Sequence, residues 1–283
     1  MMTPDQKAEV LNQALPYIQR FRGQTFVIKY GGAAMRDRSR MQGVIRNVLL
    51  LQLVGIRPIL VHGGGPEIDK WLGRLGMEKK VVEGLRVTDE ETMEVVEVAL
   101  SGKANKSLVT EVHRAGGKAV GLSGRDGALF YGEPVSEELG RVGRILKVDP
   151  SLVINLAESG YVPVVCSIAV DSFGQALNVN ADNAAAALAV AVQATKLILL
   201  TDTNGLLSDL ADATSTMSEL SSSDVRAMIS NGRLTGGMIP KVEASLEAIE
   251  GGVSNVHLIN GSNPNAILVE VFTDAGVGTM IRG

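Results

Sequence analysis

The sequence predicts an α/β fold of three layers, an αβα sandwich in which helices cover both faces of a mainly parallel central sheet. Short apolar runs without a helical period, such as residues 59–61 and 196–201, are typical of strands buried on both faces. Segments of helical spacing separate these runs almost throughout the chain, and strands that alternate with helices favour a parallel sheet. The 283 residues leave room for one large domain or two lobes.

Composition narrows the class of protein. A formal charge of −4 is too weak and too mixed for a nucleic-acid surface. The single cysteine, Cys166, excludes a disulfide framework, and its apolar surroundings predict that it packs as a small hydrophobic side chain. No window approaches the roughly 20 apolar residues of a membrane span, and the chain starts without a cleavable apolar core. We therefore expect a cytoplasmic protein that binds neither membranes nor nucleic acids.

An amphipathic helix is predicted at the start of the chain. Thr3 is a suitable N-cap, Pro4 suits the first turn, and apolar residues follow at helical spacing. Pro16 lies inside this pattern and should kink the helix. The pattern leaves two uses open: packing on its own subunit or binding another subunit.

Lys29 is unusual because lysine rarely lies inside a buried strand without a partner. Its strand, residues 25–30, runs into Gly31 and Gly32, at the end where ligands bind in open α/β sheets. We therefore predict an ammonium group that faces a crevice. The alternative is an edge lysine whose stem reaches water. A helix over residues 39–54 follows the strand.

The strongest candidate for a binding loop is the glycine run Gly63, Gly64 and Gly65. It follows a buried strand and precedes Pro66, which opens a segment of helical spacing. Residues without a Cβ let backbone N–H groups approach a ligand at the positive end of a helix, which makes an anion cradle. A tight turn without a ligand is the alternative.

Two helices are predicted after this loop. Thr88 at the N-cap and Glu91 at the N3 position form a capping box, which starts a helix ending near residue 100. A second helix is predicted over residues 104–115. Arg86, just before the capping box, can fork onto a carboxylate, although most arginines only decorate a surface.

A β-hairpin outside the main sheet is predicted from alternating runs at residues 128–135 and 140–148, and a hairpin so placed can serve as a lid. Further along, Asn178, Asn180 and Asp182 alternate with apolar residues and would share one face of an extended segment. Turn and cap chemistry is the alternative reading of these three polar residues.

Lys241 lies in the first turn of a predicted helix, where the helix dipole disfavours a cation, so something negative is expected nearby. Two ammonium groups, Lys29 and Lys241, and the carboxylate of Asp182 suit a polyanion that redistributes charge during reaction. Phosphoryl transfer has this requirement. Further N–H groups that could cradle phosphate belong to glycines near these residues: Gly31, Gly32, Gly63, Gly236 and Gly237.

The sequence offers no convincing general base and no metal site. His62, His113 and His257 have no spacing that suggests either, and His62 is expected to be a satisfied core histidine. A carboxylate acceptor is already ionised at neutral pH and needs no base. A GxxxxGK[ST] P-loop and a GxGxxG fingerprint are both absent. The residues therefore favour a kinase whose acceptor is a carboxylate or another anionic oxygen.

Several motifs occur along the chain in this order: FVIKYGG, ILVHGGGPEID, EGLRVTDEETME, GKANK, AVGLSGRDG, LNVNAD, KLILLTD and TGGMIPKVEA. Together they resemble the amino acid kinase family over about residues 10–283. The resemblance implies that family's fold and phosphoryl transfer from ATP, with Mg²⁺, to the side-chain carboxylate of N-acetyl-L-glutamate in arginine biosynthesis. It also implies that Lys29 and Lys241 stabilise the transition state and that Asp182 holds both ammonium groups.

The resemblance further assigns the acceptor site. The N–H groups of Gly64 and Gly65 would bind the acceptor, and Arg86 and Asn178 would take its α-carboxylate. The chain would then divide into an N-terminal oligomerisation helix, a lobe for the amino-acid substrate and a lobe for ATP, over residues 1–21, 22–194 and 195–283.

Arginine-sensitive members of the family carry a kinked N-terminal helix that links dimers into a hexamer, and residues 3–21 are similar to it. The C-terminal sequence also resembles their effector site for L-arginine, with Tyr17, Lys196, His257, Glu270 and Gly276 at matching positions. The resemblance thus implies feedback inhibition by L-arginine and a homo-hexamer, a trimer of dimers. It leaves open whether a PII-type signalling protein binds.

Two positions depart from the family pattern. Thr203 replaces the usual aliphatic residue near the nucleotide, and Arg141 lies in the hairpin where an aromatic residue is common. Three alternative functions also stay open: another kinase of the family acting on carbamate, uridylate, aspartate or glutamate, a silent arginine sensor, and an NAD(P)-dependent reductase.

Overall fold

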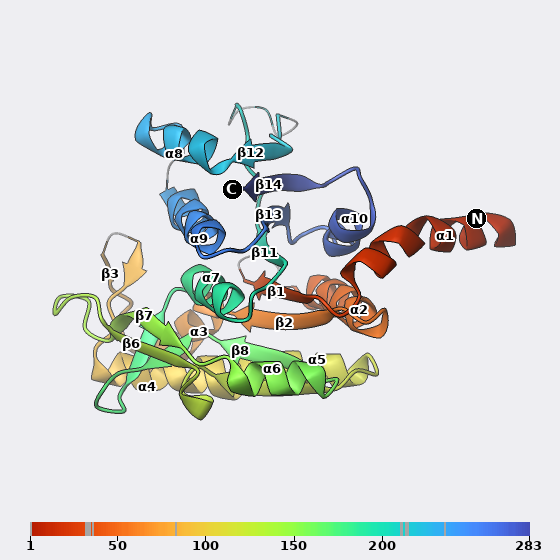
Figure 1. The fold of residues 1–283 in the computed structure, drawn as a ribbon. Helices are drawn as coiled ribbons and strands as arrows, with labels where there is room; N and C mark the ends of the chain where they lie inside the picture. The colour runs from red at the N-terminus through yellow and green to blue at the C-terminus, as the bar shows by residue number, and fades with distance from the viewer. Residues whose placement is uncertain are drawn as a thin grey trace.

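The computed structural model describes residues 2–31, 35, 37–82, 84–209, 212, 215–234 and 236–283. Its centre is an eight-stranded sheet (Figure 1), in which every neighbouring pair is parallel except β13 with β14. The order across the sheet is β12 (Glu219–Ser221), β14 (Gly278–Arg282), β13 (Asn255–Asn260), β11 (Lys196–Thr201), β1 (Thr25–Tyr30), β2 (Arg57–His62), β8 (Val162–Cys166) and β5 (Ala119–Ser123).

Helices cover both faces of this sheet, which confirms the predicted αβα sandwich (Figure 1). The alternation along β1 shows the two faces, because Val27 belongs to one hydrophobic core while Phe26 and Ile28 belong to the other. The core around Val27 includes side chains of α6 (Ser151–Glu158), α7 (Ala181–Ala191), α8 (Ser222–Ser230) and α9 (Ile239–Glu250). The opposite core includes α2 (Arg38–Leu53), α5 (Asn105–Arg114) and α10 (Ala266–Phe272).

The predicted hairpin is present, but it is half of a larger unit. Strands β6 (Phe130–Pro134) and β7 (Val142–Val148) pair antiparallel and close into a four-stranded barrel with β9 (Ile168–Val170) and β10 (Ala176–Val179). Arg141, beside this barrel, forms ion pairs with Glu90 at 3.1 Å and Asp171 at 3.5 Å. A polar network therefore surrounds Arg141.

The prediction for the helices after the glycine loop needs two corrections. Asp89, rather than Thr88, caps α4 (Glu90–Glu97), because its carboxylate accepts a hydrogen bond from the N–H of Thr92 at 2.8 Å. Thr88 is instead paired with Gly140 in an isolated bridge. The second correction is that α4 and α5 form one continuous helical run, joined by the π-helix η2 (Val98–Ala104).

Helix α1 (Pro4–Phe21) begins at the predicted N-cap, where Thr3 and Gln6 form a capping box, and contains Pro16. It extends away from the body of the molecule (Figure 1), and Phe21 is its only buried residue. Leu11 on its apolar face is 72% exposed. The helix therefore does not bury its apolar face on its own subunit. No helix in the described part of the chain is long and apolar enough to cross a membrane.

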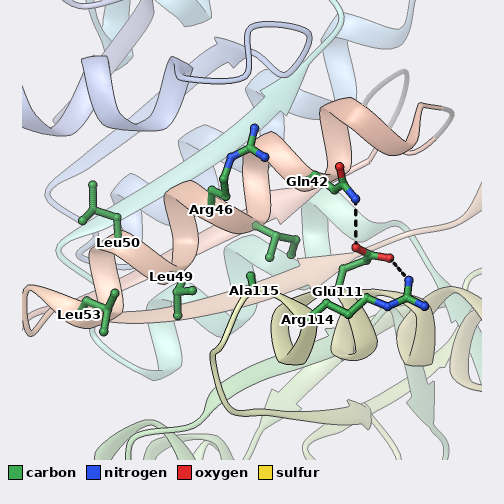
Figure 2. A pocket seen from close by; sticks show the side chains of 9 residues that line it. Gln42, Arg46, Leu49, Leu50, Leu53, Glu111, Arg114 and Ala115 are labelled. Atoms are coloured by element: carbon green, nitrogen blue, oxygen red, sulfur yellow. Dashed lines mark hydrogen bonds and ion pairs between the residues drawn. The ribbon is translucent and has the colours of Figure 1, made fainter.

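A groove of about 500 Å³ lies between α2 and α5 (Figure 2). Aliphatic side chains of α2, among them Leu49 and Leu53, line it. At its polar end the buried Glu111 carboxylate accepts hydrogen bonds from Arg114 at 2.6 Å and Gln42 at 3.5 Å. The groove contains none of the residues singled out by the sequence, so the candidate site lies elsewhere.

Candidate active site

The candidate site is a crevice of about 250 Å³ at the carboxyl ends of the parallel strands β1 and β2. This is the end of an open α/β sheet where ligands bind. The crevice brings together predicted residues from five separate elements and their loops. They are Lys29, Gly31, Gly63, Gly64, Gly65, Arg86, Asn178 and Asp182.

Two ammonium groups converge on one carboxylate at this crevice. The Lys29 Nζ lies 2.9 Å from Asp182 Oδ1, and the Lys241 Nζ lies 2.8 Å from Asp182 Oδ2. Lys29 is 6% exposed on a strand flanked by β11 and β2, so it is not an edge lysine. Lys241 is the third residue of α9, and Asp182 is the negative group expected beside it.

The electrostatics of this triad follow from burial and proximity. Burial favours the neutral form of a lysine and lowers the pKa of Lys29, although the Asp182 carboxylate opposes this shift. Burial would raise the pKa of Asp182, but Lys29 and Lys241 together outweigh burial and hold that pKa below its ordinary value. Asp182 therefore stays ionised and neutralises part of two neighbouring positive charges.

Arg86, in the short strand β4 (Leu85–Arg86) beside β3 (Val81–Val82), has a free donor at the crevice. Its Nη2 donates to Asp69 of α3 (Gly65–Leu75), while its buried Nη1 has no hydrogen-bond partner in the described part of the chain. Asn178 donates to the Thr88 hydroxyl at 3.1 Å, and that hydroxyl donates to the Arg86 carbonyl at 2.8 Å. An unpaired buried guanidinium N–H suits a carboxylate ligand.

Asp69 and Thr88 are site residues that the sequence analysis did not identify. Asp69 reaches Arg86 from the first turns of α3, and Thr88 links Arg86 to Asn178. No local pattern marks either residue for this role. An acid in the first turns of a helix and a threonine before one are ordinary features.

The segment around Asp182 does not have the predicted geometry. Strand β10 ends at Val179, and Asn180 is the N-cap of α7, accepting hydrogen bonds from the N–H groups of Asp182 at 2.7 Å and Asn183 at 3.4 Å. Cap chemistry is therefore the correct interpretation of Asn180. Asn178 lies in the strand and Asp182 in the helix, and both still line the crevice.

The glycines predicted to bind phosphate or the acceptor differ in their position relative to the crevice. A Cβ at Gly31 would lie 2.8 Å from the Lys29 Nζ and would displace the ammonium group, and a Cβ at Gly64 would clash with Leu100. Gly236 and Gly237 lie in the turn η4 (Gly236–Met238) directly before α9 and do not line the crevice. Gly32 lies outside the described residues.

The residues predicted for an effector also lie together, around a separate cavity of about 630 Å³. Lys196 Nζ lies 2.8 Å from His257 Nε2, and His257 Nδ1 lies 2.7 Å from a Glu270 carboxylate oxygen. Tyr17 of α1 donates to Asp274 at 2.7 Å at the rim, and Gly276 completes the wall. Asp274 is a further residue that the sequence analysis missed.

Burial shapes the charges in this cavity. It lowers the pKa of Lys196 to about 8 and also lowers the pKa of His257. Burial would raise the pKa of Glu270, but its hydrogen bond from His257 helps to hold the pKa below the ordinary value. The cavity thus presents the ionised Glu270 carboxylate on one side of a neutral imidazole and the Lys196 amine on the other. The carboxylate is the group suited to a cationic ligand.

Thr203, the other departure from the family pattern, keeps its side chain within its own turn. Its hydroxyl donates to the Gly205 carbonyl at 3.1 Å, and its carbonyl accepts from the Thr201 hydroxyl at 2.6 Å. Among the described residues, no cluster of histidine, cysteine, aspartate or glutamate could hold a metal ion.

Paired lysines around one aspartate at the carboxyl ends of a parallel sheet suit an enzyme that handles a migrating phosphoryl group. Comparison with known proteins agrees, because residues 24–260 match the amino acid kinase family. The chain belongs to the amino acid kinase family and is a kinase.

The particular relatives are acetylglutamate kinases. The chain is 49% identical over 293 residues to that of Heliobacterium modesticaldum, covering 99% of both chains. It is 50% identical over 278 residues to that of Nostoc punctiforme, covering 98% of this chain and 93% of the relative. A solved structure of N-acetylglutamate synthase from Neisseria gonorrhoeae, complexed with coenzyme A and N-acetyl-glutamate, superposes with a TM-score of 0.86 at 24% identity. This likeness covers 98% of this chain and 63% of the synthase, and it shows the fold alone.

Proposed function

We propose that this protein transfers the γ-phosphoryl group of MgATP to the side-chain carboxylate of N-acetyl-L-glutamate, forming an acyl phosphate for arginine biosynthesis. The observation that carries the proposal is the Lys29–Asp182–Lys241 triad. Lys29 and Asp182 line the crevice that also holds the unpaired Arg86 N–H, and Lys241 contacts it through Asp182. The names of the acetylglutamate kinase relatives support the choice of substrate.

The triad suits charge stabilisation in the transition state. Lys29 approaches from strand β1 and Lys241 from helix α9, so the two ammonium groups can flank a transferring phosphoryl unit. Asp182 holds Lys241 through a hydrogen bond and Lys29 through an ion pair. Both contacts exist before substrate binds, which removes reorganisation from the reaction step. An ionised carboxylate acceptor needs no general base.

The acceptor end of the crevice fits an amino-acid derivative. Arg86 Nη1 and the Asn178 side chain would take the α-carboxylate, while the N–H groups of Gly64 and Gly65 would face the reacting carboxylate. Hydrogen-bond acceptors for these two N–H groups are not found in the described part of the chain. They are the free donors expected at the start of helix α3.

The nucleotide would bind toward the C-terminal lobe, residues 195–283, and the acceptor toward the lobe of residues 22–194. Gly236 and Gly237 precede the N-terminus of α9, where N–H groups and the helix dipole favour phosphate oxygens. Mg²⁺ would arrive with the nucleotide and supply further charge neutralisation on the phosphates.

We also propose feedback inhibition by L-arginine and assembly through α1. The ionised Glu270 in the second cavity is suited to a guanidinium, and Tyr17 brings α1 to the same cavity. The exposed apolar face of α1 fits a contact with another copy of the chain, and the proposed assembly is a hexamer.

A hydroxamate assay tests the proposed reaction, because hydroxylamine traps acyl phosphates. ATP-dependent hydroxamate should form with N-acetyl-L-glutamate and be much weaker with L-glutamate, L-aspartate or carbamate. Strong formation with free L-glutamate would instead assign the chain to a different kinase of the family. Complete lack of turnover with intact nucleotide binding would favour a sensor.

A further inference from the structure

The three-glycine loop rests on a buried polar network that the proposed reaction does not use. His62 precedes the loop and Asn105 begins helix α5, and both residues are fully buried. His62 Nδ1 lies 2.8 Å from the Gly63 carbonyl oxygen, and His62 Nε2 lies 3.1 Å from Asn105 Nδ2. When each nitrogen of a buried histidine has a hydrogen-bond partner, the donor or acceptor character of that partner decides whether the nitrogen carries a proton.

Asn105 decides which state His62 adopts. The side-chain amide nitrogen lies 2.8 Å from the Val164 carbonyl oxygen and 3.2 Å from that of Leu122. Carbonyl oxygens only accept hydrogen bonds, so this end of the amide is the NH₂ group. The other end, Oδ1, accepts from Lys106 at 3.1 Å. The orientation of the amide is therefore determined by its surroundings.

The tautomer of His62 follows from this orientation. An amide NH₂ cannot accept a hydrogen bond, so a proton on His62 Nε2 would point at the Asn105 N–H groups. Nε2 therefore carries no proton and shares the two N–H donors of Asn105 with the Val164 and Leu122 carbonyl oxygens. The proton then resides on Nδ1 and is donated to the Gly63 carbonyl. Burial lowers the pKa of His62 to about 4, which keeps the ring neutral. Both nitrogens are thus committed, and His62 is not available as a base.

The Gly63 carbonyl and the Gly64 N–H belong to one planar peptide unit, which is trans here. In a trans peptide the two groups point in opposite directions. The hydrogen bond from His62 anchors the carbonyl on the buried side, which leaves the N–H of Gly64 on the side of the crevice that Gly64 lines. Glycines have no side chain to restrict rotation of the backbone, so the hydrogen bond from His62 is needed to keep this peptide in one orientation.

Two features of the neighbouring sequence allow the Asn105 side chain to occupy this position. A Cβ at Gly121, in the AVGLS motif, would clash with the Asn105 Oδ1, so this position requires glycine. The π-helix η2 ends at Ala104, directly before Asn105, and its Leu100 packs against Gly64. Single π-turns inside α-helices are common at functional sites. The GKANK and AVGLS motifs thereby acquire a physical role.

We propose that His62 and Asn105 are positioning residues for the acceptor site. They hold the Gly63–Gly64 peptide so that the Gly64 N–H points at the reacting carboxylate oxygen. This inference rests on the proposed function, because it assigns the crevice to an anionic acceptor.

Two nearly isosteric variants distinguish the role of His62 Nδ1 from that of Nε2. The side-chain nitrogen of His62→Asn can replace Nδ1 and keep the donor to Gly63, whereas His62→Gln places its amide near Nε2 and loses that donor. We expect His62→Gln to lose at least about tenfold in kcat/KM for N-acetyl-L-glutamate, and His62→Asn to stay within about fivefold of wild type. The KM for ATP should change little in both. His113→Gln, which alters a histidine bonded to Ala119 on the edge strand, is the matched control.

Equal losses in the two His62 variants, or full activity of His62→Gln, would overturn the proposal. A second measurement on the wild-type protein needs neither activity nor a variant. Nitrogen-15 NMR should show His62 protonated on Nδ1 alone, without titration between about pH 5 and 9. A proton on Nε2 at neutral pH would refute the inference. If the wild type fails to phosphorylate N-acetyl-L-glutamate, the proposed function is wrong, while the NMR result still tests the anchor.

Discussion

Lys29 would be an unfavourable residue inside a central strand if Asp182 did not lie 2.9 Å from its ammonium group. Lys241 has a similar difficulty at the positive end of α9, and the same carboxylate compensates for it. One aspartate therefore makes two badly placed cations tolerable. Residues kept in positions that lower stability are candidates for function. Lys29 lines the crevice, and Lys241 reaches Asp182, which also lines it.

Removal of either ammonium group should reduce turnover strongly. We expect Lys29→Ala and Lys241→Ala each to lose about 10² to 10³ in kcat, because each removes a donor aimed at developing negative charge. Hydroxamate formation at saturating substrate measures this loss. Lys118→Ala, which truncates an exposed lysine before β5, is the control and should retain wild-type turnover. A loss under about threefold in both site variants would favour the sensor interpretation.

Replacement of Asp182 by Asn should change the pH dependence of the reaction. Burial already lowers the pKa of Lys29, and the Asp182 carboxylate acts in the opposite direction. Without that carboxylate the Lys29 pKa falls further, so the ammonium group loses its proton at a lower pH. The alkaline limb of kcat/KM should therefore move to lower pH in Asp182→Asn.

At acidic pH the relevant quantity is the folding stability, and the lowered pKa belongs to a carboxylate rather than to an ammonium group. The pKa of Asp182 is lower in the folded state than its ordinary value, so its stabilising contribution is present above the ordinary value and disappears as pH falls through the lowered one. Asp182→Asn should lack this acid-dependent part of the stability. A pH profile of kcat/KM identical to that of wild type would contradict the assigned role.

Helix α1 is the element whose purpose the single chain leaves unexplained. It is capped and regular, yet its apolar residues Leu11 and Leu15 are 72% and 49% exposed. A helix of this kind is stabilised by burying its apolar face, and the proposed assembly would supply the partner surface.

A charge on the apolar face of α1 should therefore reduce the size of the assembly. We expect Leu11→Asp to lower the molar mass measured by light scattering after size-exclusion chromatography, since the buried carboxylate would oppose the contact. Gln13→Asp adds the same charge on the opposite side of the helix and should leave the mass unchanged. A wild-type protein that is monomeric would refute the proposed role of α1.

Two sites lie on opposite faces of the same central strands. Lys29 shares its face of β1 with Val27, whereas Lys196, the first residue of β11, alternates with Leu197 and faces the other core. Lys196 pairs with Phe26 and Lys29 pairs with Leu199, so the two lysines also differ by three positions along the strands. Strands β1 and β11 pair side by side, so they connect the crevice, which Lys29 lines, with the second cavity, which Lys196 lines.

Arginine sensitivity should depend on the Glu270 carboxylate. We expect L-arginine to inhibit the wild type, and Glu270→Gln to raise the half-inhibitory concentration at least about tenfold, because the charge that pairs with a guanidinium is lost. Each variant is compared with its own uninhibited rate. Glu158→Gln alters an exposed ion pair with Arg57 and serves as the control. Activity of the wild type that stays flat into the millimolar range of arginine would exclude the effector proposal.

Sequence alone was sufficient for the sandwich fold, for most strands and helices, and for Lys29, Asp182 and Lys241 as unusual residues. Hydrophobic period, cap residues and badly placed charges are local signals, and they survive in the unfolded chain. The π-helix and the closed barrel depend on packing between distant segments, so local patterns did not reveal them. The cap of α4 was misplaced because Thr88 forms a bridge with the distant Gly140, which leaves Asp89 as the cap.

Only the tertiary structure decided which groups meet. The pairs Asp182 with Lys241 and Tyr17 with Asp274 are separated by 59 and 257 positions in the chain. Hydrogen bonds between different elements also join Arg86 to Asp69 and Asn105 to His62. Propensity acts over a few residues, whereas these contacts arise from the order of the strands and the burial of their faces.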